Sequence, residues 1–294
     1  MPGTLYIVAT PIGNLEDITL RALRTLKEVD LIAAEDTRVT RRLLNRYDIH
    51  TTTVSYHAHS PMGRDLKSRP IRRTDEIVGA LREGKNVALV SDAGTPGISD
   101  PGHELIKLAI DAGIRVESIP GPSAVITALV LSGLPTARFA FEGYPPRKSG
   151  ERRSFFRSLA SQTRTVCLYE APTRLVPTLE AVRDELGERP IAVVREATKM
   201  FEEVFRGTAA QAAEHFGGKE VRGEIVIVIA GCPPDEARET AEADVDLESR
   251  LAELLDSGLS ERDAVRRCAE ELRLPRRQVY AAALKLKHSN RPSC

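Results

Sequence analysis

The sequence predicts an α/β protein with two α/β domains and a small C-terminal helical domain. Repeated strand–loop–helix segments in the first half are typical of a largely parallel sheet. Apolar segments that follow one another closely in the second half favour a mixed sheet with hairpins. The C-terminal end has helical periodicity and sharply sorted charge. We expect domains at 1–119, 120–232 and 246–294, with an acidic linker at 233–245.

The composition limits the classes of function. The 294 residues carry 42 Lys and Arg against 42 Asp and Glu, so binding to nucleic acid requires local basic patches. There is no run of roughly eighteen apolar residues and no charged leader, which predicts a cytoplasmic protein that binds no membrane. The cysteines lack metal-ligand spacing, and we expect no metal site. The four cysteines are Cys167, Cys232, Cys268 and Cys294.

The first half alternates between strands and helices. A buried strand at 4–10 runs into a Pro/Gly/Asn loop, and a second strand ends in the polar residues 35–38. The basic stretch at 55–73 is long for a loop within a domain. The expected strands are 4–10, 30–35, 87–90 and 115–121, and the expected helices are 18–30, 40–49, 75–83, 102–113 and 124–133.

The second half begins with a strand and a basic stretch at 147–157 that we expect to be mobile. Pro177 predicts a late start or a kink in the helix expected at 173–187. The C-terminal helices resemble a helix-turn-helix, with Ser260 and Asp263 in a capping box. The expected strands are 138–146, 165–172, 190–199, 202–208 and 223–231, and the last helices are 247–258, 261–272 and 275–287.

The stretch 91–102 contains three Gly, two Pro and two Asp directly after a buried strand. Ligands bind beyond the carboxyl ends of strands in open α/β sheets, and small residues let a ligand approach the backbone. The loops 10–14 and 120–124 have the same character, so we expect one cleft for a small ligand with an adenosine-like body. No Lys-bearing phosphate loop is present, which argues against a triphosphate. The alternative is an ordinary strand-to-helix connection.

Charged side chains follow several other strands and define a second candidate set. They form either an active site or structural ion pairs across a domain interface. The set comprises Glu35, Asp36, Arg38, Tyr169, Glu170, Arg174, Arg195, Glu196 and Lys199.

Three basic segments, 64–73, 147–157 and 273–291, are candidates for contact with nucleic acid. The last falls on the expected recognition helix, which favours nucleic-acid binding over a solvated cap or a dimerisation element.

Several of these motifs, taken together and in their order along the chain, resemble those of one known family. ATPIGN, AAEDTR, SDAGTPGISDPG, IPGPSA, YEAPTRL, REATKMFEE and GEIVIVIAG occur in this order. Together they resemble the ribosomal RNA small-subunit methyltransferase I family, within the tetrapyrrole-methylase-like enzymes, over 4–231 and in the helical tail. The resemblance implies a homodimer with S-adenosylmethionine between two α/β domains. It also implies methyl transfer to the ribose 2′-oxygen of a decoding-centre cytidine in 16S rRNA.

The resemblance also implies site residues. The cofactor positions fall on Pro11, Asp92, Thr95, Ile98, Ser123, Ala124 and Tyr169. The expected RNA contacts are Arg38, Arg174, Arg276 and Arg277. The sequence departs from the family pattern at Thr173, where His is usual, at Ser60-Pro61, and in the long basic segment 64–73.

A ribose hydroxyl is a poor nucleophile and needs a neighbouring base or cation. We select Asp36, Lys199 and Glu35 as catalytic candidates. Lys199 is suited to act as a base if Arg195 lowers its pKa. Glu170 and Glu196 remain alternatives.

Two other classes of function remain open. The first is a small-molecule C-methyltransferase of the tetrapyrrole type, which spectral changes with a uroporphyrinogen-type substrate would reveal. The second is a non-enzymatic RNA-binding assembly factor, which would not bind S-adenosylmethionine.

Overall fold

The first sheet consists of five parallel strands in the order β3-β2-β4-β1-β5. β4 is the central strand, and β1 lies between β4 and β5, with Leu5 opposite Val87 of β4 and Val116 of β5. The largely parallel sheet expected from the sequence is confirmed. Its strands are β1 (Thr4–Val8), β2 (Leu31–Ala34), β3 (Thr53–Ser55), β4 (Val87–Val90) and β5 (Arg115–Ile119). The structure is a computed structural model that describes residues 1–56, 70–272 and 276–289.

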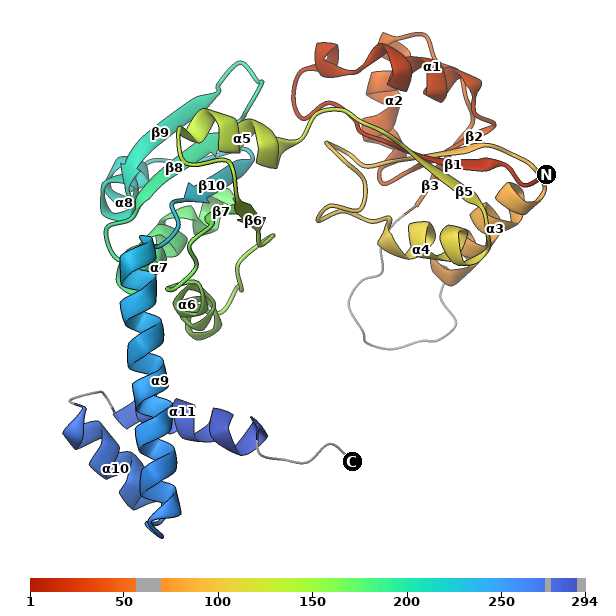
Figure 1. Cartoon of the computed structure of the whole chain (residues 1–294). Coiled ribbons are helices and arrows are strands. Elements are labelled where there is room, and N and C mark those ends of the chain that lie inside the picture. Colours follow the sequence, from red (N-terminus) through yellow and green to blue (C-terminus); the bar gives the residue numbers. More distant parts are fainter. Residues whose placement is uncertain (57–69, 273–275, 290–294) are drawn as a thin grey trace.

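Helices cover both faces of this sheet (Figure 1). Val8 packs with α1 and α2, whereas Leu5 and Ile7 pack with α3 and α4, because side chains alternate between the two faces of a strand. The strands therefore read as continuous apolar runs. The helices are η1 (Leu15–Asp17), α1 (Leu20–Glu28), α2 (Thr37–Arg46), α3 (Pro70–Arg82) and α4 (His103–Asp111).

The second sheet is mixed, in the order β6-β7-β10-β8-β9. β6 and β7 are parallel, and the other neighbouring pairs are antiparallel, as the sequence predicts. α5 (Ala124–Ser132) covers one face of this sheet. α6 (Ser149–Ser158), α7 (Leu175–Leu186) and α8 (Ala209–Phe216) cover the other. The strands are β6 (Phe139–Phe141), β7 (Thr165–Glu170), β8 (Pro190–Arg195), β9 (Glu203–Thr208) and β10 (Ile225–Ile229).

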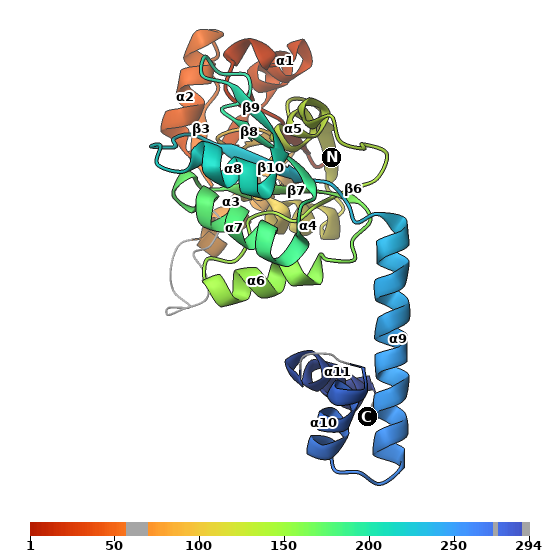
Figure 2. The same ribbon diagram turned by 90° about the vertical axis from the view of Figure 1, so that its left-hand side faces the viewer.

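A long helix, α9 (Pro234–Asp256), leads away from the second sheet to a separate helical unit (Figure 2). Leu247, Leu251 and Leu254 of α9 pack against α10 (Glu261–Glu271) and α11 (Arg276–Ser289) in their own apolar cluster. Ser260 caps α10, as its sequence predicts. Among the described residues, no helix has the length and apolar character needed to cross a membrane.

Several local predictions differ from the structure. The stretch 147–157 is not a mobile segment but contributes helix α6. The expected linker at 233–245 is helical from Pro234 onward, with proline at the favoured start of a helix. Pro177 lies in the first turn of α7, which begins late at Leu175 after the short helix η2 (Pro172–Arg174). The loop with His57 and His59, and most of the basic segment 64–73, lie outside the described residues.

Candidate active site

The loops after β1 and β4 are joined beyond the ends of their strands. Thr10 and Gly94 exchange two backbone hydrogen bonds of 2.9 and 3.0 Å. The Thr10 hydroxyl donates to the carbonyl of Ser91 at 3.1 Å. Gly94 has φ +80°, a conformation that favours glycine and allows the loop to turn back. Two of the three loops singled out in the sequence therefore form one wall.

A second pair of connections joins the ends of β2 and β4. The backbone N–H of Asp36 donates to Asp92 Oδ1 at 3.0 Å. The backbone N–H of Asp92 donates to Glu35 Oε2 at 3.2 Å. This exchange holds two carboxylates at the edge of the sheet. The acidic residues at 35–36 and the loop 91–102 thus belong to one structure.

A cavity of about 380 Å³ lies between the first and second sheets, and we call it the interdomain cavity. It is lined from the first sheet by the loops after β1, β2 and β4, and from the second by α5, by the loop after β6, and by the ends of β7, β8 and β10. Six of the seven expected cofactor residues line it, namely Asp92, Thr95, Ile98, Ser123, Ala124 and Tyr169. Pro11 lines a neighbouring cavity instead. Glu35, one of the three catalytic candidates, also lines the interdomain cavity.

The interdomain cavity is strongly acidic. The pKa of Asp100 is raised to about 6, mainly by burial and also by the nearby charges of Glu35, Asp92 and Glu224, while a hydrogen bond with Ser91 acts in the opposite direction. Glu224 comes from the second sheet, so both halves of the chain contribute negative charge. A cation bound here would favour the ionised form of Asp100.

Aromatic side chains form the opposite side of the interdomain cavity. The ring centroids of Tyr169 and Tyr144 are 5.5 Å apart, and Phe141 packs edge-on against Tyr169 at 4.9 Å. Burial raises the pKa of Tyr169 to about 12, with nearby Asp100 contributing. Tyr169 therefore stays protonated and presents an apolar ring with a polar tip.

Lys199 lies beside the interdomain cavity, where it bonds carboxylates of the second half. Its Nζ donates to Glu196 at 2.7 Å and to Glu224 at 2.9 Å. Burial lowers the pKa of Lys199, but these two hydrogen bonds outweigh burial and the net shift is upward. Arg195, expected to lower this pKa, pairs with Glu203 at 2.9 Å. Lys199 was expected to act as a base only if Arg195 lowered its pKa. This condition is not met, because the pKa is raised and Lys199 stays charged.

Lys199 also contacts the first half of the chain. A Cβ atom added to Gly13 would lie 2.4 Å from Lys199 Cγ, so only glycine fits at this approach. The loop after β1 and the end of β8 therefore meet at this side chain.

Asp36, the third catalytic candidate, caps helix α2. Its carboxylate accepts from the backbone N–H of Arg38 at 2.8 Å and binds the Arg38 guanidinium at 2.6 Å. A capping carboxylate is favourable at a helix N-terminus. The structure places Asp36 outside the residues that line the two cavities. Arg38, an expected RNA contact, has an exposed side chain.

Arg174, another expected RNA contact, binds within the protein. It pairs with the buried carboxylate of Glu170 at 2.5 Å and donates to the carbonyl of Pro145. Glu170 also accepts from Thr178 at 2.5 Å and from the backbone N–H of Ala171. These contacts fix the end of β7 beside the cavity, so the geometry favours a positioning role for both residues.

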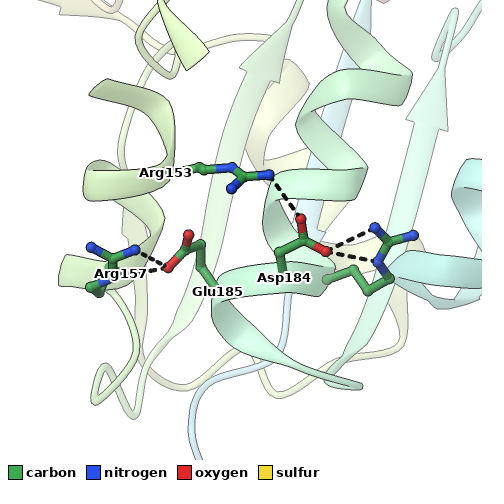
Figure 3. Close-up of polar contacts among 5 residues, drawn as sticks. Arg153, Arg157, Asp184 and Glu185 are labelled. Carbon is green, nitrogen blue, oxygen red and sulfur yellow. Dashed lines mark hydrogen bonds and ion pairs between the residues drawn. The ribbon is translucent and has the colours of Figure 1, made fainter. Parts of the chain in front are cut away.

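The basic segment of α6 is paired with acidic residues of α7 (Figure 3). Arg153 binds Asp184 at 3.2 Å, and Arg157 binds Glu185 at 2.8 Å. Its positive charge is therefore partly neutralised within the second sheet unit. In the C-terminal unit, Arg276 is exposed and pairs weakly with Glu270 at 3.5 Å. Arg277 lies one residue further along α11.

Sequence reasoning missed Glu224 and Tyr144. Glu224 directly precedes β10, whereas the sequence signals for a site in a parallel sheet stand after the strands. β10 runs antiparallel to β7 and β8, so its beginning lies beside their carboxyl ends. Within the described part of the chain, no group of three His, Cys, Asp or Glu side chains is arranged to hold a metal ion.

The fold and the cavity define a methylase of the tetrapyrrole class. The family described as Tetrapyrrole (Corrin/Porphyrin) Methylases matches residues 4–213. A cobalt precorrin-4 methyltransferase superposes with a TM-score of 0.57 at 19% identity, covering 77% of this chain and 94% of its own. A uroporphyrin-III C-methyltransferase from Thermus thermophilus, complexed with S-adenosyl homocysteine, superposes with a TM-score of 0.51 at 22% identity, covering 78% and 97%.

Curated relatives define the group more narrowly. The chain is 48% identical over 285 residues to a protein of Synechocystis sp. named ribosomal RNA small subunit methyltransferase I, covering 97% of this chain and 98% of the relative. A protein of the same name from Halalkalibacterium halodurans is 42% identical over 284 residues, covering 95% and 93%. The chain therefore belongs to the ribosomal RNA small subunit methyltransferase I family of the tetrapyrrole methylases.

Proposed function

We propose that this protein uses S-adenosylmethionine to methylate the ribose 2′-hydroxyl of a decoding-centre cytidine in 16S rRNA. The observation that carries the proposal is the interdomain cavity, where six expected cofactor residues meet in a chain of this family. The names of the relatives support the small-subunit rRNA as the substrate class.

The residues of the interdomain cavity fit this cofactor. The sulfonium and ammonium groups of S-adenosylmethionine are cationic, and Glu35, Asp92 and Asp100 supply carboxylates on one side. The apolar surfaces of Ile98 and Tyr169 suit an adenosine-like body. The volume of about 380 Å³ lies in the lower part of the range of small-ligand sites, about 300 to 1,000 Å³. When bound, the cofactor supplies an electrophilic methyl group.

The catalytic candidates receive distinct roles in this proposal. Lys199 stays charged and stabilises negative charge that develops on the acceptor oxygen. The hydroxyl proton needs an acceptor, and we assign this role to the carboxylates of Asp92 and Glu224, which border both cavities. Glu35 positions Asp92 by accepting a hydrogen bond from the backbone N–H of Asp92, and Asp36 positions the start of α2.

The remaining expectations belong to this proposal too. We infer that the units 1–119, 120–232 and 246–294 act as separate domains, and that 246–294 contacts RNA through Arg276 and Arg277. The exposed Arg38 is a further candidate for a phosphate contact. We also propose a homodimer that acts in the cytoplasm, where small ribosomal subunits are its partner.

The decisive experiment supplies the protein with methyl-labelled cofactor and small subunits that lack the modification. Nuclease digestion and mass spectrometry then locate the label. The proposal predicts label on the ribose of one cytidine in 16S rRNA. Label on a base, or labelling of a tetrapyrrole in place of RNA, would contradict it. Failure to bind S-adenosylmethionine in a calorimetric titration would favour a non-enzymatic assembly factor.

A further inference from the structure

A second cavity, of about 390 Å³, adjoins the interdomain cavity, and we call it the α2 cavity. Its walls come from the loops after β1 and β4, from one face of α2, and from Lys199 and Glu224. The two cavities share four lining residues, which are Ile12, Asp92, Ala93 and Glu224. Because they share a wall, a group held in one cavity lies next to a group held in the other.

The α2 cavity contains an unsatisfied polar group. Thr40 lines it and is 4% exposed, and its hydroxyl has no hydrogen-bond partner among the described residues. Buried polar side chains in folded proteins nearly always have a partner, so an orphan that lines a cavity points to a ligand. A ligand with a hydroxyl, carbonyl or amino group would satisfy Thr40.

The α2 cavity also carries positive charge. Arg42 lines it, is exposed, and forms no ion pair with any residue that the structure describes. Lys199, which also lines it, is held charged by Glu196 and Glu224. An exposed guanidinium without an ion pair suits a phosphate group, which it binds with two hydrogen bonds.

Much of the remaining lining of the α2 cavity is apolar, and the carboxylates of Asp92 and Glu224 lie in the wall shared with the interdomain cavity. The apolar side chains are those of Pro11, Ile12, Leu15, Val39 and Leu43. An apolar lining, one buried hydroxyl and an exposed cation together match a single nucleotide. The base and ribose would contact the apolar side chains and Thr40, while the phosphate would lie at Arg42. RNA recognition by proteins commonly uses unstacked nucleotides in this way.

We propose that the α2 cavity receives the acceptor nucleotide of an RNA strand, with Thr40 bonding its polar edge and Arg42 its phosphate. The assignment rests on the proposed methyl transfer, since it places the acceptor against the shared wall with Asp92 and Glu224. It also accounts for Pro11, which lies in the α2 cavity rather than with the other expected cofactor residues.

The test compares Arg42→Ala with Arg41→Ala, because Arg41 is the neighbouring exposed cation on α2 and does not line the cavity. We expect Arg42→Ala to raise the KM for small subunits about tenfold, whereas Arg41→Ala stays near the wild type. Thr40→Val keeps the shape and should raise this KM about fivefold without lowering the melting temperature. The affinity for S-adenosylmethionine, measured by calorimetry, should stay within about twofold in all three variants.

A second measurement does not depend on methylation. Binding of a short single-stranded RNA with one cytidine, in the presence of S-adenosyl homocysteine, should weaken in Arg42→Ala and Thr40→Val and not in Arg41→Ala. Equal RNA binding by the three variants would overturn the nucleotide site even if the wild type methylates subunits. A wild type that binds this RNA through Thr40 and Arg42 but transfers no methyl group would overturn the proposed function and leave the nucleotide site standing.

Discussion

The two adjoining cavities differ in charge and in the state of their polar groups. The interdomain cavity is lined by carboxylates, of which Glu35 accepts from the backbone N–H of Asp92, and Asp92 from the backbone N–H of Asp36. The α2 cavity carries an exposed cation, Arg42, and a buried hydroxyl without a partner among the described residues. Under our proposal, the first is a preorganised site for a cationic ligand. In the second, the proposed ligand would supply the partner of the hydroxyl.

Under our proposal, this difference separates the donor of the methyl group from its acceptor. Asp92 and Glu224 border both cavities, so we place the reaction beside these two residues. Positioning two reactants in adjacent sites supplies much of the rate of a displacement reaction. Each cavity should therefore respond to its own substitutions.

The largest expected effect comes from Lys199→Ala. Loss of a preorganised cation beside the acceptor oxygen should lower the rate of methylation about a hundredfold. The affinity for S-adenosylmethionine should change little, since Lys199 lines the α2 cavity. Single-turnover methylation and calorimetry measure the two quantities.

Lys107→Ala is the matched control for Lys199→Ala. Lys107 pairs with Asp111 on the exposed side of α4 and lines neither cavity. A Lys199→Ala variant that methylates as fast as Lys107→Ala would remove Lys199 from the mechanism.

Asp100→Asn tests the charge of the interdomain cavity. Below pH 6 the wild-type carboxyl is protonated, and binding of a cation must displace that proton. The affinity for S-adenosylmethionine should therefore rise with pH and level off above about pH 6. The affinity for S-adenosyl homocysteine, whose sulfur is uncharged, should rise less. Asp100→Asn should lose this pH dependence and bind S-adenosylmethionine about tenfold less tightly at pH 8. A pH slope that persists in Asp100→Asn would assign the titration to another group.

The same carboxyl affects folding stability. The pKa of Asp100 is raised on folding, so the folded state holds the proton more tightly and stability falls as pH rises from about 4 to 6. Asp100→Asn should be more stable than the wild type above pH 6, by about 1 kcal/mol once solvent screening is allowed for. Urea unfolding at pH 5 and pH 8 measures this difference. A gain of equal size at both pH values would contradict it.

Two substitutions of Asp36 distinguish a helix-capping role from a catalytic role. Asp36→Ala removes the cap of α2 and should destabilise the protein by about 1 kcal/mol, whereas Asp36→Asn keeps the cap and most of the stability. Our structure predicts that Asp36→Asn also keeps methylation within about threefold. Loss of methylation in a stable Asp36→Asn variant would restore Asp36 as a catalytic residue.

The smallest expected effect is the stability change of Thr40→Val. The native hydroxyl is buried without a partner, so its removal should leave stability unchanged or raise it by up to about 1 kcal/mol. Thermal unfolding without ligand measures this change. A clear loss of stability would show that the hydroxyl is bonded in the free protein.

The interdomain cavity could be predicted from the sequence because its residues lie in loops of unusual composition. Gly, Pro and Asp cluster after β4, and the register of a parallel sheet brings such loops to one edge. The alternation of strands and helices predicted the first sheet for the same reason. These signals are local, so one sequence is enough to find them.

The α2 cavity could not be predicted from the sequence in this way. Val39, Thr40 and Leu43 belong to an ordinary amphipathic helix, and only the folded chain shows that one side of it faces an opening. Glu224 reaches the site because β10 runs antiparallel to its neighbours. The helix α6 was missed because its arginines are matched by acidic residues about thirty positions later, as for Arg153 and Asp184.

The most direct test is a cryo-electron-microscopy structure of the protein bound to the unmodified small subunit with S-adenosyl homocysteine. Our account predicts S-adenosyl homocysteine in the interdomain cavity and one nucleotide of 16S rRNA in the α2 cavity, near Thr40 and Arg42. The ribose 2′-oxygen should face the shared wall at Asp92 and Glu224. An empty α2 cavity, with the acceptor nucleotide reaching S-adenosyl homocysteine from another side, would contradict the account.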